Sequence, residues 1–167
     1  MWPDRLDAWL RELDLEPVDR AEREGVSSRD LLLDGRLRRA IRVTLILAPD
    51  LGLVAWVHYA PPLGDSLRKT YRQLLKWNDE LPFVKFALSE DDAVALMAEV
   101  ADADLDADAV GRMVARLVAV CDLLHADSAR LLRPGGGGQT EGSRPTDPTP
   151  LLDRYAADLA ELAAKEA

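Results

Sequence analysis

The sequence predicts an α+β fold in which helices pack against an antiparallel sheet. Three observations predict it. The first segment repeats its apolar residues at helical spacing, residues 41–59 alternate at strand spacing, and a second striped helix follows Asp106. The chain has 167 residues, of which 48% are hydrophobic. This length fits one domain with an appendage and is enough to bury one core.

The composition disfavours several classes of protein. The apolar runs are shorter than the roughly 18 residues of a membrane span, and a net charge of −9 disfavours binding to nucleic acid. The single cysteine, Cys121, excludes an internal disulfide and a multi-cysteine zinc site. The N-terminal segment lacks the pattern of a signal peptide, so we expect a cytoplasmic protein with no membrane partner. The sequence contains no cofactor-binding motif, so we expect no cofactor.

The first helix begins near Pro3, which suits a first helical turn. Its apolar stripe is formed by Leu6, Trp9, Leu10 and Leu13, and we expect this stripe to face the core.

A sheet follows this helix. Asp34-Gly35 is typical of a hairpin turn. Residues 41–47 and 53–59 alternate as strands around the turn 49–52, and Pro61-Pro62 ends the second strand. Because both faces of these strands carry apolar side chains, one face must meet helices and the other needs a second cover. The second face holds Ile46, Val54 and Trp56.

Two helices and a strand are expected next. One helix is capped by Asp65 or Ser66 and ends near Asn78, and FVKFAL (residues 83–88) is typical of a strand. Residues 89–100 fit either an alanine-rich helix or a hairpin turn at 89–92 followed by a strand. A long helix begins after Asp106, its N-cap. Its buried side is predicted to hold Val110, Met113, Val114, Leu117, Cys121, Leu124 and Leu131.

The C-terminal region is an appendage. Residues 133–150 are rich in glycine and then in proline, which is typical of a flexible linker, and residues 151–167 form a short amphipathic helix. So short a helix is marginal alone, so we expect it to dock on this domain, on a dimer mate or on another protein. One hypothesis is that it mimics a client and occupies the client-binding face. Residues 1–132 form the domain itself.

The run from Val43 to Leu88, with WND at Trp77 to Asp79, and the late-helix segment LVAVCDLL resemble the YbjN-like family in its actinobacterial form. That family is similar to type III secretion chaperones of the CesT kind. The resemblance covers about residues 1–132. It implies that 93–100 is a strand, in a sheet of about five strands with helices largely on one face. The implied order is α-β-β-β-α-β-β-α, and the resemblance also implies a homodimer that holds a client segment.

Other motifs favour structural roles. His58 and His125 have no local partners that would make either imidazole a catalytic base. Ser66 to Lys69 matches S-x-x-K without its companion motifs. The acidic run from Asp102 to Asp108 lacks the glycine and glutamate of a calcium loop, so we expect no metal there.

The sequence therefore predicts a non-enzymatic, chaperone-like module with no catalytic residues, which binds a peptide or protein segment. The alternative is a signal-transduction regulator that senses a small molecule in an apolar pocket. The predicted partner-binding residues are Ile46, Val54, Trp56 and His58.

Overall fold

The computed structural model describes residues 2–49, 51–62, 68–126 and 147–163, and it confirms the α+β fold. The helices are α1 (Trp2–Glu12), α2 (Arg68–Glu80), α3 (Ala107–Leu123), α5 (Leu151–Arg154) and α6 (Ala156–Ala163), with a 3-10 turn η1 (Asp102–Asp104) before α3. The strands are β1 (Asp19–Arg23), β2 (Val26–Leu33), β3 (Ile41–Ala48), β4 (Gly52–Ala60), β5 (Lys85–Leu88) and β6 (Val94–Val100).

The strands form one antiparallel sheet in the order β1-β2-β3-β4-β6-β5. It has one strand more than the five expected. The additional strand, β1, is polar and fully exposed, so no apolar alternation marks it in the sequence. It is joined to β2 through Glu24 and Gly25, whose φ angles of 52° and 82° suit a two-residue hairpin. Residues 93–100 are confirmed as a strand after a turn at 89–92.

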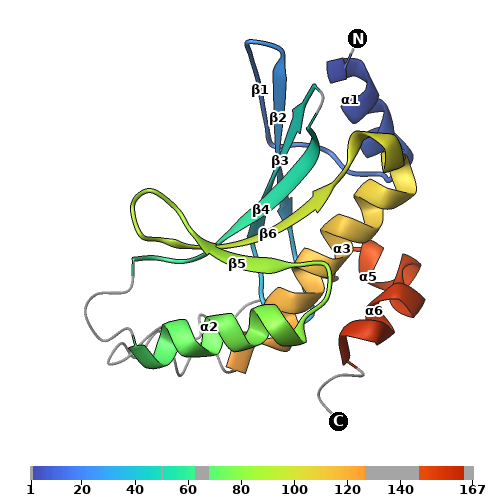
Figure 1. Ribbon diagram of the computed structural model, residues 1–167. Helices are drawn as coiled ribbons and strands as arrows, with labels where there is room; N and C mark the ends of the chain where they lie inside the picture. Colours follow the sequence, from blue (N-terminus) through green and yellow to red (C-terminus); the bar gives the residue numbers. More distant parts are fainter. Residues whose placement is uncertain (1, 50, 63–67, 127–146, 164–167) are drawn as a thin grey trace.

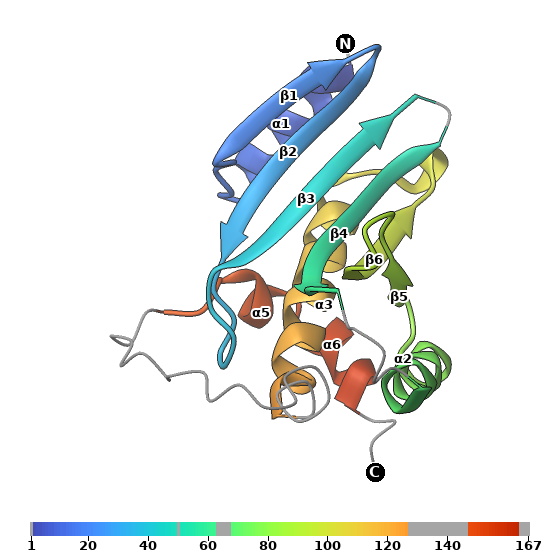
Figure 2. The same cartoon turned by 90° about the vertical axis from the view of Figure 1, so that its left-hand side faces the viewer.

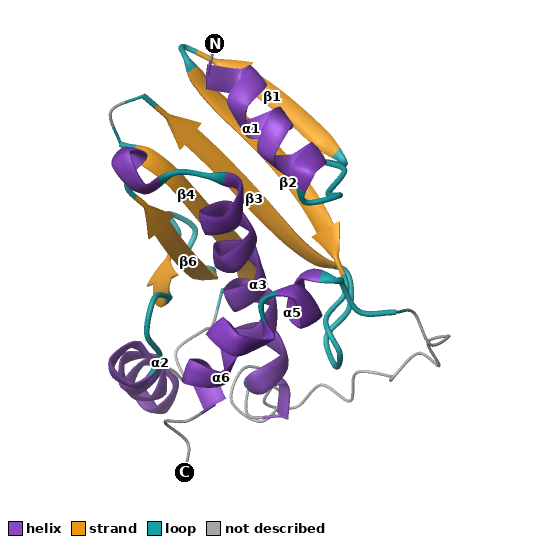
Figure 3. Cartoon of the chain, turned by 90° about the vertical axis from the view of Figure 1, so that its right-hand side faces the viewer, coloured by secondary structure: helices purple, strands orange, loops and turns teal. Residues whose placement is uncertain are grey.

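Helices cover only one face of this sheet in the described part of the chain. Figure 3 shows α1 and α3 lying across the sheet, with α5 and α6 packed on the side of α3 that faces away from the sheet. Figure 2 shows the opposite face, on which no described helix lies. Helix α2 lies apart from this layer, beside β5 at the sheet's edge (Figure 1).

The core lies between the sheet and α3. The inward residues of the central strands, such as Leu45, Val57 and Leu96, are fully buried or nearly so. Each contributes roughly 1.5–3 kcal/mol relative to an exposed side chain. Helix α3 is apolar on several sides, because the sheet covers one side and α5 and α6 cover another.

One charged side chain lies on the covered face. Arg29 of β2 is only 3% exposed, and its guanidinium contacts Asp7 of α1 at 2.8 Å and Glu22 of β1 at 2.7 Å. The hydrogen bonds from Arg29 hold the pKa of Asp7 below its usual range. A buried charge requires such partners, so Arg29 fixes α1 over the β1–β2 hairpin.

The expected tight hairpin at Asp34-Gly35 is wrong, because the β2–β3 connection runs over residues 34–40. The glycine serves a different purpose. A Cβ atom on Gly35 would lie 2.3 Å from a carboxylate oxygen of Asp122. That carboxylate accepts hydrogen bonds from the backbone N–H groups of Arg36 (2.6 Å), Leu37 (3.0 Å) and Arg38 (2.9 Å). Asp122 therefore fixes the loop against α3.

Candidate functional site

The four predicted binding residues lie together on the open face of the sheet. Ile46 of β3 pairs with Val54 of β4, and Trp56 and His58 follow at every second position along β4. Their neighbours in sequence point to the core, so these side chains point away from the helices. The first three are half-buried and His58 is exposed.

Strands β6 and β5 extend this surface. Across the β4–β6 pairing, Trp56 lies opposite Met97 and His58 opposite Ala95, and Ala95 in turn lies opposite Ala87 of β5. Sequence reasoning missed these side chains. The β6 segment has no regular alternation, since Val94, Ala95 and Leu96 are all buried.

The open face is hollowed at its β5–β6 end into a groove of about 590 Å³. We call this the sheet groove. Strand residues provide an apolar floor, and the β5–β6 turn provides a polar rim. The lining residues are Trp56, His58, Ala87, Leu88, Ser89, Glu90, Asp91, Ala95 and Met97.

The aromatic rings of the groove are in contact. The ring centroids of Trp56 and His58 lie 4.7 Å apart with the planes tilted by 47°. The indole N–H of Trp56 is buried and makes no hydrogen bond within the described residues. The surrounding side chains therefore hold the Trp56 ring mainly by packing.

The rim carries negative charge close to His58. The hydroxyl of Ser89 donates a hydrogen bond to Asp91, and this bond is the largest cause of a pKa of Asp91 below its usual range. The neighbouring imidazole lowers it slightly further. Ser89 donates its hydroxyl hydrogen to the carboxylate of Asp91 and not to the imidazole of His58. The three side chains therefore lack the hydroxyl–imidazole hydrogen bond that activates a serine nucleophile.

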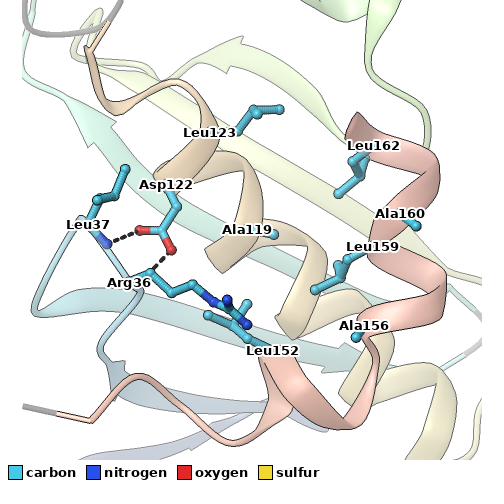
Figure 4. Close-up of a pocket in the computed structure, with 10 residues that line it drawn as sticks. All are labelled: Arg36, Leu37, Ala119, Asp122, Leu123, Leu152, Ala156, Leu159, Ala160 and Leu162. Atoms are coloured by element: carbon cyan, nitrogen blue, oxygen red, sulfur yellow. Dashed lines mark hydrogen bonds between the residues drawn. The ribbon is translucent and has the colours of Figure 1, made fainter. Parts of the chain in front are cut away.

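A second cavity lies on the covered side of the molecule, between α3, α6 and the β2–β3 loop (Figure 4). We call it the α3–α6 groove; its volume is about 640 Å³. Ala119 lies on its floor, with Leu37 on one side and Leu159 on the other (Figure 4). Arg36 at its edge is ion-paired with Asp153 at 2.8 Å. Sequence reasoning missed this cavity, because it forms only when the C-terminal segment docks.

The C-terminal segment docks on α3 and does not occupy the open face, so the client-mimic hypothesis is wrong for this surface. The segment is also not one helix, since α5 and α6 meet at Tyr155. The ring of Tyr155 lies against Gly111, where a Cβ atom would be 2.3 Å from the phenol oxygen, and its hydroxyl donates to Asp108 at 2.9 Å. Most of the predicted linker, residues 133–150, is outside the described residues.

Several smaller predictions concern single residues of α3 and its surroundings. Asp106 caps α3 by accepting a hydrogen bond from the N–H of Ala109, as predicted. Burial raises the pKa of the Cys121 thiol to about 12, which fits a core residue. His125 is exposed, and Ser66 lies outside the described residues.

The described residues contain neither a cluster of metal ligands nor a membrane-spanning helix. No group of three or more His, Cys, Asp or Glu side chains there is arranged to hold a metal ion. No helix in these same ranges has the length and apolar composition needed to cross a membrane.

The family model of YbjN, described as "Putative bacterial sensory transduction regulator", matches residues 3–125. The chain belongs to the YbjN family. The segment formed by α5 and α6 lies beyond the matched residues. Among curated proteins, no relative matches the chain.

Solved structures share this fold, two of them from type III secretion. The ExsC–ExsE complex matches with a TM-score of 0.56 and 21% identity, over 80% of this chain and 98% of that one. The Yersinia pestis chaperone SycH, solved with a fragment of YscM2, matches with a TM-score of 0.53 and 20% identity, over 74% of this chain and 99% of that one. The ExoU–SpcU complex of Pseudomonas aeruginosa matches with a TM-score of 0.50 and 22% identity, over 77% of this chain and 98% of that one. The YbjN-family chain therefore has the fold of type III secretion chaperones, as the sequence resemblance implied.

Proposed function

We propose that this chain is a non-enzymatic, chaperone-like module that binds a peptide or protein segment on the open face of its sheet. The observation that carries the proposal is the sheet groove, with its apolar floor of Trp56 and Met97. Apolar surface of this kind, uncovered by any described helix, is typical of a protein-interaction site. The similar solved structures are complexes with protein partners, which supports the same class of function.

The proposed mechanism has two parts. Apolar side chains of the client are buried against Ile46, Val54 and Trp56, with His58 at the end of the row. Strand β5 lies at the edge of the sheet, where the side chain of Asn78 on α2 accepts a hydrogen bond from the N–H of Phe86 and donates one to its carbonyl. Backbone pairing with an extended client is therefore limited to the rest of that edge.

Selection from a displayed library of random peptides on the purified full-length chain tests this function. We expect recovered peptides to share apolar residues and to lose at least tenfold in affinity for the Trp56→Asp variant. The matched control is Leu37→Asp, which places the same charge at a 65% exposed leucine in the other groove. Equal affinity for the wild type and the Trp56→Asp variant would contradict the proposal.

The same proposal includes a homodimer in the cytoplasm. Leu75 of α2 is 69% exposed and offers an apolar contact for a second copy. We expect sedimentation to give twice the monomer mass, and Leu75→Asp to lower the dimer fraction. A monomer at micromolar concentration would contradict this part.

A second candidate function is a regulator that senses a small molecule, and the α3–α6 groove favours it. Its volume lies in the range of known ligand sites, roughly 300–1,000 Å³, and its lining is mostly apolar. Filling the floor with Ala119→Phe should then abolish the uptake of an apolar fluorophore. Peptide binding should be unchanged in the same variant. Unchanged uptake of the fluorophore would exclude this groove as its site.

A further inference from the structure

The sheet groove combines an apolar floor with an acidic rim. Trp56, Ala95 and Met97 line the floor, while Glu90 and Asp91 line the rim on the β5–β6 turn. Both carboxylates are exposed. The lining contains no lysine or arginine, so a ligand in this groove meets apolar surface and negative charge together.

The lysine of β5 is directed away from the groove. Lys85 of β5 lies opposite Met97 in the strand pairing, but its ammonium group donates to the backbone carbonyl of Asn78 on α2. Within the described residues, neither rim carboxylate has an ion pair with a lysine or arginine. The rim charge is therefore available to a partner.

The Asp91 carboxylate of the rim is held in its charged form by a hydrogen bond. Hydrogen bonding from Ser89 lowers the pKa of Asp91, so its charge persists well into the acid range. A charged carboxylate accepts a stronger hydrogen bond from a lysine or arginine than a neutral backbone carbonyl does. The chain as a whole carries a net charge of −9, which adds a long-range attraction for basic segments.

The geometry of an extended chain determines which of its residues can reach the floor and the rim together. An extended segment lying over the groove points residues i and i+2 to the same side, about 7 Å apart. One of these side chains can then fill the space above Trp56 and Met97 while the other reaches Glu90 and Asp91. A flexible methionine on the floor accepts different apolar side chains.

We propose that the sheet groove recognises an extended peptide segment in which a large apolar residue and a lysine or arginine stand two positions apart. This inference rests on the proposed function and names the chemistry of its client. Acidic segments are excluded by repulsion from the rim, so the groove selects clients by charge as well as by apolar area.

Three labelled peptides of one extended design test the inference by fluorescence anisotropy with the full-length chain. They share a central leucine and differ only two positions later, where they carry Lys, Gln or Glu. We expect the Lys peptide to bind about fivefold tighter than the Gln peptide, and the Glu peptide to bind weakest. The differences should shrink at high salt, because exposed charge pairs are screened.

Variants of the rim then locate the preference. Glu90→Gln combined with Asp91→Asn should remove the advantage of the Lys peptide, and Glu90→Gln alone should reduce it while keeping the bond from Ser89 to Asp91. The matched control, Glu12→Gln with Asp14→Asn, removes the same two charges at exposed positions near the end of α1 and should keep the advantage.

The outcomes separate the two levels of the proposal. If all three peptides bind the wild type equally and lose affinity with Trp56→Asp, the charge preference is refuted and the proposed function stands. If the rim and control variants lose the tighter binding of the Lys peptide over the Gln peptide to the same extent, that result refutes a specific role for the rim carboxylates. If none of the peptides binds, the proposed function and the inference fail together.

Discussion

Replacing Asp122 with alanine should destabilise the fold by about 2–4 kcal/mol. Its buried carboxylate accepts three backbone hydrogen bonds, from Arg36, Leu37 and Arg38. Hydrogen bonds to a charged group contribute about 1.5–3 kcal/mol each. Part of this contribution returns when the released N–H groups meet water, because the loop is partly exposed. The loss should therefore be smaller than the sum of three bonds.

Urea denaturation followed by tryptophan fluorescence measures this loss. With a urea dependence of about 2 kcal/mol per molar, a loss of 3 kcal/mol lowers the unfolding midpoint by about 1.5 M. The slope of the transition should stay the same, since only a local contact is removed. A midpoint within about 0.2 M of wild type would refute the assigned role of Asp122.

Gly35→Ala completes a double-mutant cycle. In the wild type the new Cβ atom would lie 2.3 Å from the carboxylate of Asp122, so the substitution should cost stability. In the Asp122→Ala background the clash is gone, and the substitution should be neutral or stabilise by up to about 1 kcal/mol. An equal cost in both backgrounds would mean that the close approach does not explain the glycine.

Three further predictions concern the pH dependence, the thiol and the C-terminal segment. Asp7→Asn should lower stability at neutral pH; because the folded pKa of Asp7 is lowered, the difference should persist above pH of about 4 and vanish at lower pH. Urea denaturation at several pH values measures the stability difference between wild type and variant. A difference that is the same at every pH would contradict the ion pair between Asp7 and Arg29. Cys121, whose pKa is raised to about 12, should react with Ellman's reagent only in concentrated urea, and fast native reaction would contradict its burial. Gly111→Ala should displace Tyr155 and speed proteolysis within the docked segment, residues 151–163, although alanine favours helix; unchanged cleavage there would contradict the assigned contact.

The sequence predicted those elements in which local pattern and tertiary environment agree. Strands β3 and β4 alternate because one face is fully buried and the other partly open, and the predicted bounds differ from the structure by at most one residue at each end. Strand β1 was missed because it is exposed on both faces. Strand β6 was ambiguous because alanine-rich segments favour helix by propensity, while its pairing with β4 is a long-range contact.

The candidate site was predictable only in part, for the same reason. Alternation alone places Ile46, Val54, Trp56 and His58 on one face, and the structure places them there; their role in binding stays a prediction. The acidic rim depends on β6 pairing with β4, which brings Asp91 beside His58. No pattern within either segment contains that information.

In the proposed function, clients bind on the open face of the sheet. Photo-crosslinking can locate the bound peptide, with a benzophenone amino acid placed at Met97 in the sheet groove or at Ala119 in the α3–α6 groove. The labelled Lys peptide should crosslink to the full-length chain from position 97 and not from position 119, and unlabelled peptide should compete. Crosslinking from position 119 alone would contradict the claim.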